Sequence, residues 1–299
     1  MLLESLIDKA TQAAKKTIAV AAAEDQEVID AVIDALERNL GHFILYGNEE
    51  KIATILECKK CSWDQKVKIV HADSIAEAAE LAVKAVFNKE ANVLMKGNIP
   101  TNIFLKAVLN KEFGLRTGNV LSHVAAFEVP DFDRLIFVTD AAMNIAPDLE
   151  QKAGIAKNAV AIARSLGIEI PKVAPIAAVE VVNPSMQATM DAAALTLMNK
   201  RGQITGCVID GPLALDNAIS ELAAEHKGIH SDVAGNADIL LVPAIEVGNA
   251  LYKSLVYFAK AKVGAVIAGA KVPIVLTSRA DTAESKLYSL ALALSSANE

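Results

Sequence analysis

The chain has 299 residues and a formal net charge of −7, and 53% of its residues are hydrophobic while only 4% are aromatic. This length suffices for two domains of ordinary size, each with its own core. The acidic balance excludes a general attraction to nucleic acid or to an anionic membrane, so an anionic ligand would need a local group of basic side chains.

The N-terminal segment carries acidic residues where a signal peptide would carry basic ones, and no apolar run reaches membrane-spanning length. We therefore expect a soluble, cytoplasmic protein.

Short apolar runs alternate with amphipathic segments along the whole chain. After an amphipathic opening helix, we expect strands at 17–22, 42–46, 68–71, 92–96, 135–139, 173–179, 206–210, 239–242, 265–268 and 272–277. We expect helices at 26–39, 76–87, 149–165, 186–199, 214–226 and 248–260, a helix capped by Thr101, and a last helix from Ala283 to Leu294. Such alternation requires crossover connections, so the sequence predicts an α/β fold with mostly parallel sheets.

Polar residues follow five of the predicted strands. They are Lys96-Gly97-Asn98, Asp140 with Asn144, Asp210 with Asp216, Gly248-Asn249, and Ser278-Arg279. Each group alone could be ordinary turn chemistry. Open α/β sheets bind ligands at the carboxyl ends of their strands, however, and the agreement of five turns therefore indicates a ligand site.

The turn at Ser278 and Arg279 joins a predicted buried strand to the last predicted helix. Free backbone N–H groups, the positive end of the helix dipole and a guanidinium together favour an anion. We expect a phosphate group or a developing oxyanion there. The alternative is that both residues only end the strand and pair with a surface carboxylate.

Common catalytic and nucleotide motifs are missing from the sequence. It contains no GxGxxG, GxSxG or HExxH, and the segment 264–271 departs from a P-loop. Cys58 and Cys61 form a CxxC that nothing completes, and we interpret His226 and His230 as solvated. These observations argue against ordinary Rossmann dehydrogenases, P-loop kinases, α/β-hydrolases and zinc proteases.

Six segments around these polar residues resemble those of one enzyme family. They are KGNIPT, LSHVAAFEVP, FVTDAAMN, IDGPLALDNA, NADILLVPAIEVGNALYK and PIVLTSRADTAESK. In this order and over nearly the full length, they are similar to the phosphate acetyl/butyryltransferase family, and within it to the butyryl branch.

The resemblance implies a fold similar to that of isocitrate and isopropylmalate dehydrogenases. Two α/β domains, each a mostly parallel three-layer α/β/α sheet, would enclose an active site in the interdomain cleft. Residues 1–128 and 268–299 would form the first domain, which carries Ser278 and Arg279, and 129–267 the second. The family also implies a homo-oligomer.

The implied reaction is butanoyl-CoA + phosphate = butanoyl phosphate + CoA, by direct transfer in a ternary complex. Arg279 would bind the phosphoryl oxygens and stabilise transition-state charge, and Ser278 would donate to the carbonyl oxygen or the thiol. Residues implied in phosphate or coenzyme A binding are Lys96, Lys106, Arg116, Asp140, Asn144, Asp210, Asp216, Gly248, Asn249 and Lys253. Acyl-CoA and phosphate are the expected partners, and we expect no cofactor, metal, nucleic acid or membrane.

Two positions differ from the acetyl branch. That branch has a proposed base aspartate seven positions after the serine, where this chain has Ser285 with Glu284 beside it. Glu284 and Asp281 are therefore candidate general bases, with helix capping as their alternative role. Ala141 occupies a position that is usually cysteine in acetyl enzymes, which favours the butyryl branch.

Three alternative functions stay open. The first is an acetyl, branched or other short-chain specificity. The second is an NAD- and metal-dependent decarboxylating dehydrogenase of the same fold, with Asp140, Asp210 and Asp216 as metal ligands. The third is a non-catalytic sensor of acyl phosphate or coenzyme A. The preferred acyl chain, the general base, the oligomer size and the physiological direction do not follow from the sequence.

Overall fold

The structure is a computed structural model that describes residues 2–12, 15–58, 65–276 and 281–297. The chain forms two compact units. The terminal unit comprises Glu4–Asn119 and Gly264–Glu299, and the central unit comprises Val120–Val263 with Met1–Leu3. The domain boundaries expected at 128/129 and 267/268 stay a prediction.

The sheet of the terminal unit has the strand order β3-β2-β1-β4-β11-β10. The strands are β1 (Thr17–Ala21), β2 (His42–Gly47), β3 (Val67–His71), β4 (Val93–Lys96), β10 (Lys262–Ala268) and β11 (Ile274–Leu276). All neighbours are parallel except β10 and β11. Because β1, β2 and β4 are buried almost throughout, they read as continuous apolar runs, as expected for a sheet covered on both faces.

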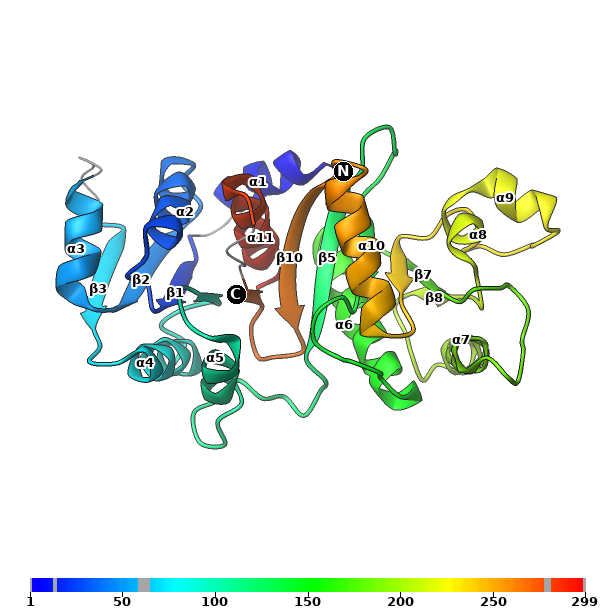
Figure 1. Cartoon of the computed structure of the whole chain (residues 1–299), viewed down its shortest axis with the longest axis horizontal. Helices are drawn as coiled ribbons and strands as arrows, with labels where there is room; N and C mark the ends of the chain where they lie inside the picture. Colours follow the sequence, from blue (N-terminus) through cyan, green and yellow to red (C-terminus); the bar gives the residue numbers. More distant parts are fainter. Residues whose placement is uncertain (1, 13–14, 59–64, 277–280, 298–299) are drawn as a thin grey trace. The chain divides into compact units, whose positions relative to one another are not determined.

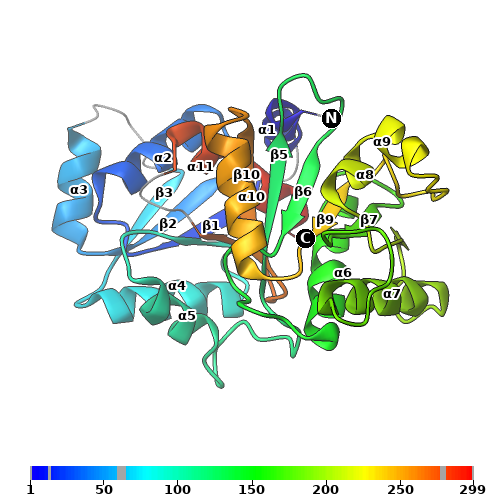
Figure 2. The same cartoon turned by 45° about the vertical axis from the view of Figure 1, so that its right-hand side comes forward.

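Helices cover this sheet on both faces (Figures 1 and 2). They are α1 (Leu3–Gln12), α2 (Gln26–Glu37), α3 (Glu49–Glu57), α4 (Ile75–Phe87), α5 (Thr101–Val108) and α11 (Ala283–Ser296). α2 packs beside α11 on one face, and α4 packs beside α5 on the other. The helix α11 is the most deeply covered of these, with every residue from Lys286 to Leu294 buried.

The sheet of the central unit has the order β5-β6-β9-β7-β8. Its strands are β5 (Ser122–Glu128), β6 (Ile136–Thr139), β7 (Lys172–Pro175), β8 (Val208–Ile209) and β9 (Ile239–Leu241). Its helices are α6 (Leu149–Ser165), α7 (Gln187–Lys200), α8 (Leu215–Ile219), α9 (Glu221–His226) and α10 (Ile245–Tyr257). Only β5 and β6 pair antiparallel, so the carboxyl ends of β6, β9, β7 and β8 meet at one edge.

The predicted α/β class and mostly parallel pairing are confirmed, with differences in particular elements. The strand β5 and the helix α3 were not predicted, although Asn48 caps α3 and Ile52 and Leu56 give it a buried face. The predicted helix 214–226 is divided because Ser220 adopts an extended conformation and caps α9. No helix in the described part of the chain is long and apolar enough to cross a membrane.

A buried ion pair joins two helices of the central unit. Lys152 of α6 donates to Asp191 of α7 with 2.6 Å between Nζ and Oδ2, and both side chains are more than nine-tenths buried. Gln187 donates to the second carboxylate oxygen of Asp191 at 2.7 Å. The pair therefore neutralises two charges that water does not solvate.

Replacing only one partner of this pair should destabilise the protein strongly. Asp191→Ala leaves the Lys152 ammonium buried without a counter-charge, which should lower the free energy of unfolding by about 3–5 kcal/mol. The double variant Lys152→Met/Asp191→Leu removes both charges, so its free energy of unfolding should fall much less. Urea denaturation checks this order, and a double variant as unstable as Asp191→Ala would contradict it.

Candidate active site

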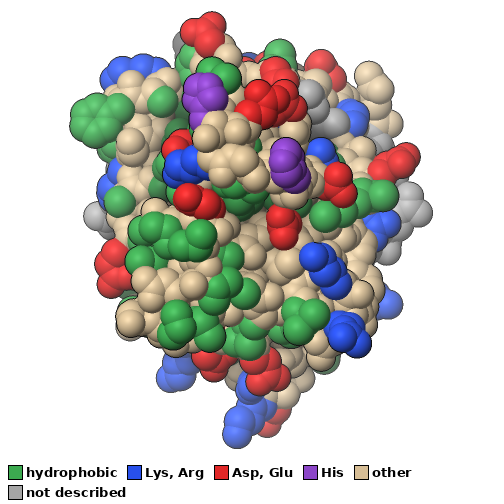
Figure 3. Space-filling model, turned by 90° about the vertical axis from the view of Figure 1, so that its right-hand side faces the viewer, with side chains coloured by type: hydrophobic (Ala, Val, Ile, Leu, Met, Phe, Trp, Pro, Cys, Tyr) green, Lys and Arg blue, Asp and Glu red, His purple; other side chains and the backbone are tan. Residues whose placement is uncertain are grey.

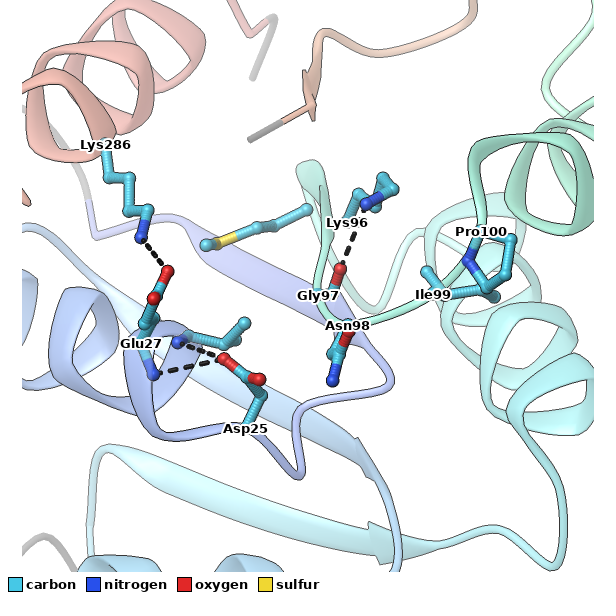
Figure 4. Close-up of a pocket in the computed structure, with 10 residues that line it drawn as sticks. Asp25, Glu27, Lys96, Gly97, Asn98, Ile99, Pro100 and Lys286 are labelled. Atoms are coloured by element: carbon cyan, nitrogen blue, oxygen red, sulfur yellow. Dashed lines mark hydrogen bonds and ion pairs between the residues drawn. The ribbon is translucent and has the colours of Figure 1, made fainter. Parts of the chain in front are cut away.

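A pocket of about 180 Å³ opens at the carboxyl ends of β1 and β4 in the terminal unit (Figure 4). Its lining consists of Asp25, Glu27, Val28, Met95, Lys96, Gly97, Asn98, Ile99, Pro100 and Lys286. Parallel strands bring these segments to one edge although they are distant in sequence. The pocket therefore lies where α/β sheets bind ligands.

The pocket also adjoins the strand that leads to the predicted catalytic turn. Leu276, the last residue of β11, pairs with Lys96, which in turn pairs with Ala21 of β1. Ser278 and Arg279 follow two and three residues later in sequence and lie outside the described residues. Their predicted roles thus stay predictions, while the described strand end beside Lys96 belongs to this edge.

Two lysines supply positive charge to the pocket from different elements. Lys96 ends β4 and donates to the carbonyl of Gly97 at 3.2 Å. Lys286 comes from α11 and donates to Glu27 at 3.2 Å (Figure 4). No side chain caps the start of α5 at Pro100, which lies on the opposite side of the pocket from Lys286 (Figure 4). The lining also contains the carboxylates of Asp25 and Glu27, so its formal charges balance. The two ammonium groups and the uncapped start of α5 are the features that can accept an anion.

The sequence predicted Lys96 but missed Lys286 and Glu27. A signal for Lys286 was present, because a lysine stands at the start of a long apolar stretch of α11, where a surface residue is not expected. No sequence signal pointed to Glu27, because its proximity to Lys286 arises only from the packing of α2 against α11.

The other predicted residues of the terminal unit do not line this pocket. Lys106 is exposed on α5, and Arg116 is exposed in the segment after it. Next to Arg116, Thr117 donates its hydroxyl to the carbonyl of Gly269 at 2.6 Å, which fastens that segment to the unit. The predicted binding roles of Lys106 and Arg116 stay predictions.

The start of α11 shows which residue caps this helix, while the catalytic roles predicted for Glu284 and Asp281 stay predictions. Thr282, and neither acid, caps this helix by accepting the Ser285 N–H at 3.1 Å. Glu284 is exposed and accepts a 2.8 Å hydrogen bond from the Tyr288 hydroxyl one turn later, while Asp281 is half-buried before the cap. Capping, the alternative role considered for both acids, is therefore carried by the threonine.

In the central unit, Asp140 organises the turn that follows β6. Its Oδ1 accepts the N–H groups of Ala142 and Met143 at 2.8 and 2.9 Å. Its Oδ2 accepts the N–H and the side-chain amide of Asn144 at 3.2 and 2.6 Å. Because four donors match the lone-pair sites of a carboxylate, Asp140 shapes this turn, and the geometry favours that role over direct substrate contact.

This turn packs against the first turn of α10. A Cβ at Gly248 would approach the Asp140 carbonyl oxygen to 2.5 Å, so only glycine allows the close contact. The Asn249 side chain donates to the Ala141 carbonyl at 3.4 Å. The structure thus brings together Asp140, Asn144, Gly248 and Asn249, and it leaves Lys253 exposed on α10.

The two remaining predicted aspartates lie elsewhere in the central unit. Asp210 follows β8, which is separated from β6 by β9 and β7. Three strand spacings place the ends of β6 and β8 about 14 Å apart. Asp216 is exposed on α8 and pairs with Lys227 at 3.8 Å. Asp140 and Asp210 therefore do not converge on one ion, which weakens the dehydrogenase alternative.

The described residues contain no metal cluster, and the thiol of Cys207 is not activated. No group of three His, Cys, Asp or Glu side chains in that part of the chain could hold a metal ion. His226 and His230 are exposed. Figure 3 shows that some histidine side chains reach the surface on the face drawn there. Burial raises the pKa of the Cys207 thiol to about 11, so it stays protonated at neutral pH. The predicted absence of a cofactor stays a prediction.

The contrast between Asp140 and Asp216 can be tested by paired substitutions. Asp140→Ala removes the acceptor of three backbone N–H groups and should lower the free energy of unfolding by about 2 kcal/mol or more. Asp216→Ala removes an exposed carboxylate and should change it by less than about 0.5 kcal/mol. Chemical denaturation measures both, and equal stabilities would contradict the structural role of Asp140.

Comparisons with known proteins agree with this architecture. The family profile described as "Phosphate acetyl/butaryl transferase" matches residues 65–294. The chain is 60% identical over 299 residues to a probable phosphate butyryltransferase of Bacillus subtilis (strain 168), covering 100% of this chain and 99% of the relative. It is 50% identical over 291 residues to the phosphate butyryltransferase of Clostridium beijerinckii, covering 97% and 96%.

Solved structures give the same result. A branched-chain phosphotransacylase from Enterococcus faecalis V583 superposes with a TM-score of 0.85 at 38% identity, covering 94% of this chain and 98% of that one. A 4-hydroxythreonine-4-phosphate dehydrogenase from Klebsiella pneumoniae shares the fold alone, with a TM-score of 0.58 at 11% identity over 95% and 100% of the two chains. The chain therefore belongs to the phosphate acetyl/butyryl transferase family of acyltransferases, as its sequence motifs implied.

Proposed function

We propose that this protein transfers a butyryl group between coenzyme A and phosphate. A phosphate oxygen attacks the thioester carbonyl, the carbon–sulfur bond breaks, and the coenzyme A thiolate leaves and takes up a proton. The products are butyryl phosphate and free coenzyme A. In the reverse direction the thiol, whose pKa is near 8.5, must lose its proton before it attacks, so a neighbouring base or cation helps at neutral pH.

The observation that carries this proposal is the 60% identity, over the whole length, to a protein named as a probable phosphate butyryltransferase. The pocket of the terminal unit supports it, because Lys96 and Lys286 bring two cations to the edge of a sheet. Ser278 and Arg279, which follow β11 in sequence, would add a hydroxyl and a guanidinium. Direct transfer also agrees with the protonated state of Cys207.

A branched-chain substrate is the second candidate. The Enterococcus faecalis structure named as a branched-chain phosphotransacylase is 38% identical to this chain, which is lower than the identity to the butyryltransferases. A change of one methylene alters binding by only about 1–3 kcal/mol, so related acyl groups compete for one pocket. Butyryl is the better-supported substrate.

Acyl preference is measured by mixing the protein with phosphate and acetyl-, propionyl-, butyryl-, isobutyryl- or valeryl-CoA and following the release of free thiol. We expect phosphate-dependent release with the highest kcat/KM at butyryl-CoA. A maximum at isobutyryl-CoA would assign the branched-chain activity. No release with any of these thioesters would reject the transferase proposal.

Arg279 is the residue whose loss should affect transfer most. Arg279→Ala should reduce kcat by at least about 100-fold, because a cation that stabilises transition-state charge contributes several kcal/mol. The folded state should persist, as judged by circular dichroism and the thermal midpoint. Arg38→Ala, which removes a surface arginine paired with Glu4, is the control and should leave turnover unchanged. Near-normal turnover of Arg279→Ala would remove this residue from the mechanism.

A further inference from the structure

Lys286 is a buried cation, and its hydrogen-bond acceptor among the described residues is an exposed carboxylate that can rotate away. Its side chain is 8% exposed, and among the described residues its ammonium contacts Glu27 alone, at 3.2 Å. An ammonium has three donors, so two of them have no acceptor in the described structure. The nearby Ser289 hydroxyl, in contrast, is satisfied, because it accepts from the Ala265 N–H and donates to the Ser285 carbonyl.

Glu27 differs from Lys286 in its access to water. Its side chain is 59% exposed, and it stands in the first turn of α2, where Asp25 and not Glu27 provides the cap. The Glu27 carboxylate can therefore rotate into water without disturbing the helix. Lys286 cannot follow, because its own side chain is buried and it begins the buried stretch Lys286–Leu294 of α11.

We propose that Lys286 binds an anionic group of the substrate in this pocket, and that the Glu27 carboxylate occupies the ammonium only while the pocket holds no anion. The two residues would act as an exchangeable ion pair. This inference rests on the proposed function for the identity of the anion, which would be inorganic phosphate or a phosphate group of coenzyme A.

The exchange follows from the unequal solvation of the partners. A surface carboxylate that leaves an ion pair regains hydration, so Glu27 loses little when it swings out. A buried ammonium without a counter-charge is strongly unfavourable, so Lys286 needs an anion in its place. Space for the incoming anion is already present, because the pocket extends from Lys286 to Lys96 (Figure 4).

A purely structural role makes a different prediction. If the pair served only to hold α2 against α11, then removing either charge would lower stability and leave anion affinity unchanged. If Glu27 competes with the ligand, its removal must strengthen anion binding. The two substitutions therefore act in opposite directions on affinity only under the proposal.

The test measures binding of inorganic phosphate to the full-length protein by isothermal titration calorimetry. Lys286→Met should raise the Kd for phosphate by about tenfold or more, because a charge-assisted hydrogen bond is lost. Glu27→Gln should lower the Kd by about two- to fivefold, since the competing ion pair is weak at an exposed carboxylate. In the Glu27→Gln background, Lys286→Met should have a larger effect than in the parent.

The matched control is the ion pair of Glu80 and Lys84 on α4, in the same unit but away from the pocket. Glu80→Gln and Lys84→Met change the net charge equally and should leave phosphate affinity unchanged. Parallel titrations with coenzyme A and dephospho-coenzyme A distinguish the source of the anion. If Lys286→Met weakens binding of coenzyme A but not of dephospho-coenzyme A or inorganic phosphate, the anion at this site is the 3′-phosphate of coenzyme A, and the inference holds for that phosphate group.

Three outcomes would overturn the inference. They are a parent protein that binds neither phosphate nor coenzyme A, a Lys286→Met variant with parental affinity for both ligands, and identical affinities of Glu27→Gln and Glu80→Gln for the ligand that the parent binds. Should Lys286→Met fail to fold, the affinities of Glu27→Gln and Glu80→Gln still test the inference. Calorimetry measures binding without turnover, so its result is independent of the thiol-release assay that tests the proposed function. A parent that binds phosphate through Lys286 but releases no thiol keeps this inference and loses the transferase proposal.

Discussion

The parallel pairing of β1, β4 and β11 is the constraint on which the site of the terminal unit depends. Parallel strands end at the same edge, so residues near positions 25, 96 and 286 surround one pocket. The edge also collects the starts of α2 and α5, and the N-terminal end of a helix carries partial positive charge. An enzyme that handles phosphate needs such an edge, because nothing in its overall charge of −7 would attract an anion.

Polar residues at this protein's sheet edges either shape a turn or are available to a ligand. The hydrogen bonds that each residue makes within its own unit distinguish the two roles. The carboxylate of Asp140 accepts hydrogen bonds from the turn that follows β6. Gly248 allows α10 to approach that turn closely. These residues determine the shape of the central unit's edge. Lys286, in contrast, has donors without an acceptor among the described residues, which is the property expected of a group that meets a ligand.

Burial has opposite consequences for the two buried lysines. Lys152 faces a carboxylate that is as buried as itself and is held by Gln187, so its charge is permanently compensated. Lys286 faces a carboxylate that water can reach. The first arrangement suits a structural ion pair, and the second suits an exchangeable one.

The sequence by itself determined the α/β class, most elements and the family, because alternating apolar runs and six segments around the strand ends are local properties of the chain. It also indicated Lys96 and the turn residues near 140 and 248. It did not reveal β5 or α3, although the Asn48 cap and the apolar residues Ile52 and Leu56 of α3 are local features of the sequence. Only the tertiary structure decided that Asp140 and Asp210 lie apart and that Glu27 meets Lys286, because strand order and helix packing join residues that are distant in sequence.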